Sequence, residues 1–124
     1  MIKVTIENLV KAMASGALPR LYGIRKTISA GHRNRKLPAS VEGELKHYEE
    51  QRKALIERYH GIAATPDARF FTFPEGEMAG FERDIKELLS QTVELPGEPL
   101  KLTDLLDGGL LETDYDLLEP FLTE

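Results

Sequence analysis

Residues 40–59 read SVEGELKHYEEQRKALIERY, and this stretch decides the fold class because it is the longest regular pattern in the chain. Its apolar, aromatic and long-stemmed side chains recur at steps of four, three, four, three and four residues, the spacing of one face of an α-helix. Ser40 is a favourable N-cap residue just after Pro38, and Gly61 suits the position after a helix C-terminus. The pattern predicts an amphipathic helix over residues 40–59, whose stripe comprises Val41, Leu45, Tyr48, Arg52, Leu55 and Tyr59.

Working outward, a second strong helical pattern covers residues 75–91. Acidic residues fill its first half, where they complement the helix dipole. Weaker helical patterns predict helices over residues 7–14, 19–28 and 115–122, of which the last is short and acidic. The apolar face of the second main helix comprises Met78, Phe81, Ile85, Leu88 and Leu89.

Short strands are expected between these helices. Alternation or aromatic content predicts strands at residues 1–6, 69–73, 92–95 and 99–102, with a loop at 61–68 and a helical turn at 103–106. An extended lead into the first helix is an equal alternative for residues 1–6. We therefore predict an α+β fold, in which two main amphipathic helices pack on a short, mostly antiparallel sheet with a short acidic C-terminal helix, as a single domain over residues 1–124.

Composition excludes several kinds of chemistry. The 124 residues are 41% hydrophobic and 30% charged, as in an ordinary folded domain. The absence of cysteine removes disulfides, thiol nucleophiles, iron–sulfur clusters and cysteine zinc sites. No apolar run approaches the roughly 18 residues of a membrane span, and the first residues lack the apolar core of a signal peptide. We therefore expect an intracellular protein that does not bind membranes.

The net charge of −5 hides an asymmetry along the chain. Residues 1–60 hold 12 Lys and Arg against 6 Asp and Glu, whereas residues 61–124 hold 4 against 15. Residues 20–36 contain no acidic residue and form a candidate basic binding patch, and the last 21 residues contain no basic residue. The basic patch comprises Arg20, Arg25, Lys26, Arg33, Arg35 and Lys36, and the candidate acidic C-terminal face comprises Asp104, Asp107, Asp114 and Asp116.

Cations at this density repel one another unless an acidic group lies near them, or unless they form a solvated surface. The acidic group could be nucleic acid phosphate, the acidic part of the same chain or of a neighbouring copy, or an acidic protein partner. Nucleic acid ranks lower because the acidic half would repel it and because only Tyr22 offers a stacking surface within the patch. Basic and acidic patches on one small chain favour head-to-tail contacts between copies, so we expect a homo-oligomer.

No motif in the chain names a reaction. The three histidines, His32, His47 and His60, lack the i, i+4 spacing of a helical metal pair. Phosphate-binding glycine loops and nucleophile elbows are missing from the sequence, and the clustered aspartates lack the spacing of a calcium loop. We therefore predict no catalytic residue, no bound metal and no cofactor, and we expect the protein not to be an enzyme.

Residues 36–40, KLPAS, and residues 44–59, ELKHYEEQRKALIERY, resemble the core of a family of small uncharacterised proteins from tailed phages and prophages. The likeness continues through the helix at 81–89, VEL at 93–95, PLKLTDL at 99–105 and LLEPF at 117–121, so it covers roughly residues 36–122. Residues 62–67 replace an acidic, glycine-containing loop of the family, and the basic stretch at 20–35 is individual to this chain. The resemblance implies a phage gene product in a bacterial host cytoplasm, and it carries over no activity or site residue.

Together these observations favour binding over catalysis. We expect a virion-associated or assembly accessory protein of the head–tail, tail or baseplate region, which acts by protein–protein contacts, either in the host cytoplasm or as part of the virion. The alternatives are a phage-encoded binder that modulates a host or defence protein and, second, a nucleic-acid-binding regulator. The regulator would bind DNA or RNA with an affinity that falls steeply with salt.

Overall fold

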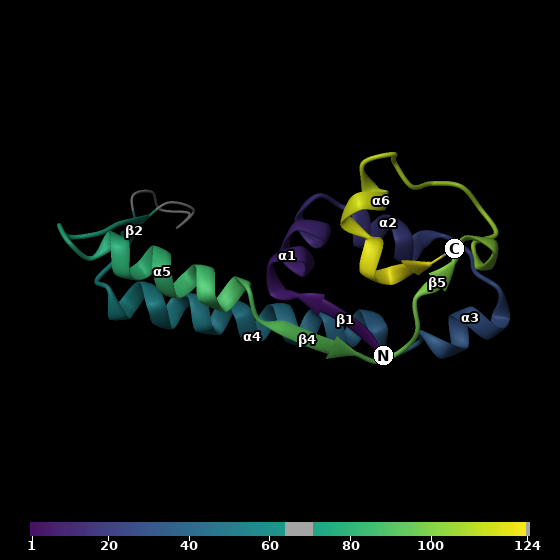
Figure 1. Ribbon diagram of the computed structural model, residues 1–124, viewed down its shortest axis with the longest axis horizontal. Coiled ribbons are helices and arrows are strands. Elements are labelled where there is room, and N and C mark those ends of the chain that lie inside the picture. Colours follow the sequence, from purple (N-terminus) through teal and green to yellow (C-terminus); the bar gives the residue numbers. More distant parts are fainter. Residues whose placement is uncertain (64–70, 124) are drawn as a thin grey trace.

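The computed structural model describes residues 1–63 and 71–123 and shows a body from which a helical hairpin projects (Figure 1). The first half of the chain forms β1 (Ile2–Thr5), α1 (Ile6–Ala14), α2 (Ala17–Gly23), α3 (Ile28–Arg33), α4 (Leu37–Arg58) and β2 (Ile62–Ala63). The second half forms β3 (Phe71–Thr72), α5 (Met78–Leu89), β4 (Thr92–Leu95), β5 (Leu100–Lys101), η1 (Leu102–Asp104), α6 (Asp114–Leu117), η2 (Glu119–Phe121) and β6 (Leu122–Thr123). The predicted α+β class is confirmed.

The strands form three separate pairs in the part of the chain that the structure describes. β1 pairs with β4 in antiparallel register, from Ile2 opposite Leu95 to Thr5 opposite Thr92. β2 and β3 form a second antiparallel pair, and β5 and β6 a parallel one. Each ladder has only two strands, so helix packing supplies most of the core.

The core lies in the body, between α1, α2, the first half of α4 and the C-terminal segment. Alternate residues of β1 are buried, which confirms the predicted strand, and Thr5 ends it by capping α1 through its hydroxyl. The C-terminal segment folds back onto α1 and β1 (Figure 1). The largest fully buried side chains are Phe121, Ile2, Leu9, Leu18, Leu21, Leu95, Leu100, Leu118, Val41 and Asp114.

The main helix α4 follows the predicted stripe but begins earlier. Val41 and Tyr48 are buried as expected. Ser40 is not the N-cap, because its backbone N–H already donates to the Lys36 carbonyl at 3.1 Å inside the helix. Pro38 lies in the first turn, where a helix needs no N–H from it.

The predicted helix over residues 19–28 is wrong, because the chain turns out of the helix at Ile24. α2 ends at Gly23, and Ile24 is extended with φ −77° and ψ 132°. Lys26 then forms an antiparallel bridge with Leu105, and the Thr27 hydroxyl caps a new helix, α3. Ile28, the last residue of the predicted helix, is 92% exposed. Tertiary pairing with the C-terminal segment overrides the local helical pattern here.

Other boundaries also differ from the predictions. α5 begins at Met78, three residues later than predicted. The predicted loop at 61–68 starts with β2, and residues 64–68 of that loop, with residues 69–70 of the predicted strand, lie outside the described residues. The predicted helix 115–122 is wrong: α6 ends at Leu117, a 3-10 turn with Pro120 near its start follows, and Leu122 pairs in β6.

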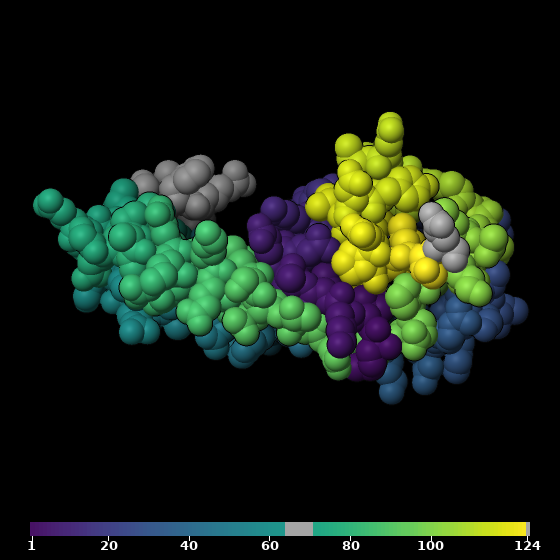
Figure 2. Space-filling view, in the orientation of Figure 1, coloured from purple at the N-terminus to yellow at the C-terminus, as the bar shows by residue number. Residues whose placement is uncertain are grey.

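The hairpin leaves the body as a narrow extension (Figure 2). We call residues 46–58 of α4 together with α5 the helical arm, at whose tip β2 and β3 pair. No helix among the described residues is long and apolar enough to cross a membrane.

Candidate functional site

The basic patch and the acidic face meet within one chain at the side of the body. Arg20 of α2 binds Asp114 with two hydrogen bonds, Nε to Oδ2 at 2.7 Å and Nη2 to Oδ1 at 2.6 Å. The Asp114 side chain is only 1% exposed and also accepts from the Leu111 backbone N–H at 2.8 Å. These contacts hold the pKa of the Asp114 carboxyl below its usual value, chiefly because of the hydrogen bonds from Arg20.

Two further ion pairs continue this contact. Arg25 binds Asp107 with two hydrogen bonds of 2.8 and 2.9 Å, and its backbone carbonyl accepts from Leu106 at 2.9 Å. The pair lowers the pKa of the Asp107 carboxyl. Arg33 reaches Asp104 at 3.4 Å. The arginines and aspartates pair in opposite chain order, so residues 104–114 run antiparallel to residues 20–33.

The remaining predicted site residues do not join this contact. The Lys26 ammonium donates to the backbone carbonyls of Leu21 and Ile24, each at 2.7 Å. Arg35 donates to the carbonyl of His32 at 2.8 Å, and Lys36 is the exposed N-cap residue of α4.

Asp116 is exposed on α6 and borders a shallow groove beside β1 and Thr92. Among the described residues, Asp116 forms no hydrogen bond or ion pair with the basic patch.

Of the partners considered for the basic patch, the structure therefore supplies one, the acidic part of the same chain. Three of its six cations are paired there, and the C-terminal segment packs on its own body. The head-to-tail contact between copies predicted from the charges would have to compete with these intramolecular pairs. The same pairing leaves fewer cations for nucleic acid phosphates.

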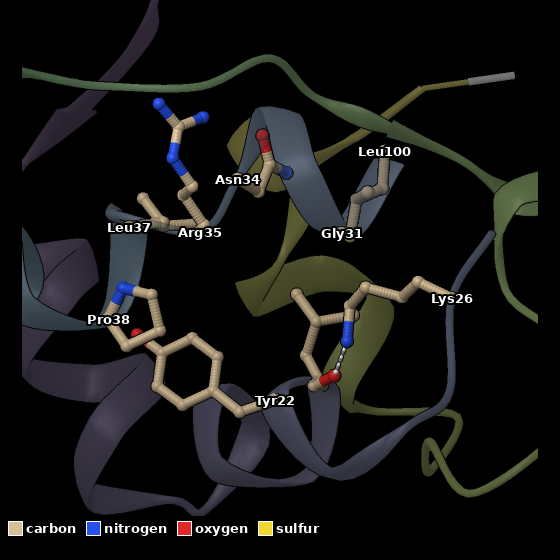
Figure 3. Close-up of a pocket in the computed structure, with 9 residues that line it drawn as sticks. Tyr22, Lys26, Gly31, Asn34, Arg35, Leu37, Pro38 and Leu100 are labelled. Carbon is tan, nitrogen blue, oxygen red and sulfur yellow. Dashed lines mark hydrogen bonds between the residues drawn. The ribbon is translucent and has the colours of Figure 1, made fainter. Parts of the chain in front are cut away.

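A cavity that sequence reasoning missed lies between α2, α3, the start of α4 and β5 (Figure 3). Its volume is about 190 Å³. The Tyr22 ring is half-buried, and its hydroxyl oxygen is fully buried without a hydrogen-bond partner among the described residues. The cavity is lined by Leu21, Tyr22, Lys26, Gly31, Asn34, Arg35, Leu37, Pro38 and Leu100.

Burial changes the acidity of two groups in this cavity. It raises the pKa of the Tyr22 phenol to about 12, because the phenolate would lose its hydration. It lowers the pKa of the Lys26 ammonium for the same reason. The side chain of Asn34 is hydrogen-bonded to the backbone of Glu98: it donates to the Glu98 carbonyl at 3.0 Å and accepts from the Glu98 N–H at 2.9 Å.

The helical arm carries a different kind of surface. Phe73 stacks on Phe81 with ring centroids 4.5 Å apart, and the Tyr59 hydroxyl donates to Asp84 of α5. No residue of α5 is fully buried: Met78 is 46% exposed, and the other apolar residues of the predicted face are partly buried.

The described residues include no group of three or more His, Cys, Asp or Glu side chains that could hold a metal ion. Comparisons of the chain with protein-family models, with curated proteins and with solved structures found no match. The resemblance to a phage family therefore stays a prediction.

Proposed function

We propose that this chain is a non-catalytic phage or prophage assembly protein that acts by protein–protein contacts, and that its helical arm binds the arm of a second copy. The observation that carries the proposal is the incompletely buried apolar face of α5, which has no fully buried residue and includes the exposed Met78. Burial of apolar surface stabilises by roughly 25 cal/mol per Å², and α4 covers this face only in part. A partner surface would complete the burial.

The charges of the helical arm favour a second copy as that partner. Residues 46–58 and 78–89 hold six basic and six acidic side chains, whereas the whole chain has a net charge of −5. Two arms therefore meet without the net repulsion that other faces of the molecule would cause. Two antiparallel hairpins related by a two-fold axis form a four-helix bundle, and such isologous contacts are common in homodimers.

The phage context of the proposal rests on the resemblance of residues 36–122 alone. A virion-associated or assembly protein requires repeated contacts with other subunits, and a self-complementary arm is suited to that. The body would then be free to contact other components of the particle, after synthesis in the bacterial cytoplasm.

The test is the solution mass by light scattering over a range of protein concentrations, at low and high salt. We expect a dimer that survives high salt, because the arm contact is apolar. Met78→Glu places a charge on the exposed apolar face and should give a monomer. The matched control is Ile28→Glu, which makes the same kind of change at a 92% exposed site on the body and should leave the dimer intact.

A wild-type chain that stays monomeric at every concentration would overturn the arm-to-arm contact. A capture experiment that then recovers one specific host protein would favour the host-modulating alternative. The second measurement is the detection of the protein in particles purified from a phage lysate. The assembly role requires that the particles contain the protein or its direct binding partner.

A further inference from the structure

The C-terminal segment carries an open apolar groove on the surface of the body, apart from the helical arm (Figure 1). Three apolar side chains from separate elements line it: Leu102 of η1, Tyr115 of α6 and Leu122 of β6. Leu102 is 49% exposed and Tyr115 is 46% exposed, although the same segment packs on the core through Leu118. Apolar side chains that gather in one hollow, rather than being scattered singly, are typical of a contact surface.

The size of the groove limits what it can bind. Its volume is about 170 Å³. A cavity of about 150 Å³ is enough to hold benzene, so the groove accommodates one side chain of the size of leucine or phenylalanine. A bound helix would present several anchors in a row, which this groove has no room for. We therefore expect a partner that inserts a single large apolar side chain.

The rim of the groove is acidic. Residues 102–123 hold six Asp and Glu and no Lys or Arg. Ion pairs with arginines neutralise three of the six, namely Asp104, Asp107 and Asp114. Glu119 lines the groove, and Asp116 lies three residues before it; neither forms an ion pair among the described residues.

The cations nearest to these two carboxylates leave them unpaired in the described part of the chain. Lys3, which borders both carboxylates in the shallow groove beside β1, is paired with Glu94 at 3.7 Å. Lys101 precedes Leu102 in the chain but does not line the apolar groove. Two carboxylates are therefore available to the cations of a partner, and the groove complements a basic segment better than a neutral or acidic one.

We propose that this groove docks a basic segment of a partner protein, in which one large apolar side chain stands between Lys or Arg residues. The apolar side chain lies against Leu102, Tyr115 and Leu122, and the flanking cations reach Glu119 and Asp116. This surface is separate from the helical arm, so the proposal does not depend on whether two arms associate.

The test is a titration of the full chain with a synthetic peptide in which one leucine lies between two pairs of lysines, followed by amide chemical shifts in nuclear magnetic resonance spectra. One control peptide replaces the leucine by serine, and another replaces the lysines by glutamates. We expect shifts centred on Tyr115 and Leu122, with the leucine peptide binding at least about 10 times more tightly than the serine peptide, because a buried leucine contributes that much. The glutamate peptide should not bind, and high salt should weaken binding of the lysine peptides.

Matched variants separate the groove from a general attraction to acidic surface. Leu102→Ser should weaken binding of the leucine peptide by about 3–10-fold, whereas Leu106→Ser, at a similarly exposed leucine outside the groove, should not. Glu119→Gln should weaken binding of both lysine peptides by about 2–5-fold, whereas Glu112→Gln, at an exposed carboxylate outside the groove, should not. All of these side chains are exposed, so each variant keeps the fold.

The proposal is overturned if the leucine peptide shows no saturable shifts below a dissociation constant of roughly 1 mM. It is equally overturned if the serine peptide binds as tightly, or if the control variants weaken binding as much as the groove variants do.

Light scattering of the Met78→Glu chain, which lacks the arm contact, tests whether a second copy fills the groove instead. We expect a monomer. If the Met78→Glu chain self-associates and Leu102→Ser abolishes that association, a second copy occupies the groove, and the proposal of a different partner protein is overturned.

Discussion

Replacing Tyr22 by Phe should make the protein more stable, because the substitution removes one buried and unpartnered hydroxyl. The Tyr22 oxygen is inaccessible to solvent and has no hydrogen-bond partner in the described residues, while its ring packs against the core. The ring of Phe occupies the same position, so no cavity larger than the lost oxygen is created. The change therefore isolates the desolvation of a single polar group.

The expected magnitude follows from that desolvation. Leaving a buried polar group without a partner costs about 1–3 kcal/mol. Tyr22 as a whole is half-buried, so the lower end applies and we expect the free energy of unfolding to rise by about 1 kcal/mol. In a domain of this size that corresponds to a rise of roughly 3–5 °C in the melting temperature.

The pH dependence gives a second signature of the same hydroxyl. Its pKa in the folded protein is about 12, above the ordinary value of 10.0. Below pH 10 the phenol is neutral in both states, and between pH 10 and 12 the unfolded chain releases the proton first, so stability falls with rising pH. Tyr22→Phe should abolish that part of the alkaline loss.

The assay is urea unfolding of both chains, monitored by circular dichroism at pH 7 and again at pH 11. Tyr115→Phe is the matched control, because Tyr115 is 46% exposed and its hydroxyl reaches water, so its loss should change the free energy by less than about 0.5 kcal/mol. A destabilisation of about 0.5 kcal/mol or more for Tyr22→Phe at pH 7 would refute the reasoning, because it would show that the hydroxyl has a partner.

Two further predictions concern the C-terminal contact and α4. The pKa values of Asp114 and Asp107 are lowered in the folded protein, so their ion pairs add stability above about pH 4, and this stability is lost as the pH falls through the folded-state pKa values. An Asp114→Asn chain should therefore lose less stability in acid, as measured by unfolding curves at a series of pH values. Equal acid sensitivity of the variant and the wild type would contradict this contact. Gly43 is exposed within α4, and a Cβ added there meets nothing within 4 Å, so Gly43→Ala should raise the free energy of unfolding by about 0.5–1 kcal/mol. Gly80→Ala should lower the free energy of unfolding, because its Cβ would clash with the Tyr59 ring. Thermal melts compare the two variants, and equal effects would show that helix propensity alone determines the outcome.

The elements that the sequence predicted well are those whose signal is local. The stripe of α4, the apolar positions of α5 and the alternation of β1 repeat every few residues, and that period reports the secondary structure without knowledge of any partner. The α+β class follows from those elements. Helix ends were predicted less well. The predicted start of α4 lay after Pro38, whereas the helix begins at Leu37 and includes Pro38 in its first turn.

Only the tertiary structure determined which distant residues and elements contact one another. Arg20 and Asp114 lie 94 residues apart, and both an intramolecular and an intermolecular partner satisfied the charge pattern equally. The path through Ile24 depends on the bridge from Lys26 to Leu105, which no local pattern signals. The cavity at Tyr22 likewise exists only because α2, α3, α4 and β5 converge. Periodicity along a chain determines which face of an element is apolar, but contacts between distant segments depend on how those faces pack in three dimensions. That packing gives the arginines and aspartates of this protein their partners and leaves the Tyr22 hydroxyl without one among the described residues.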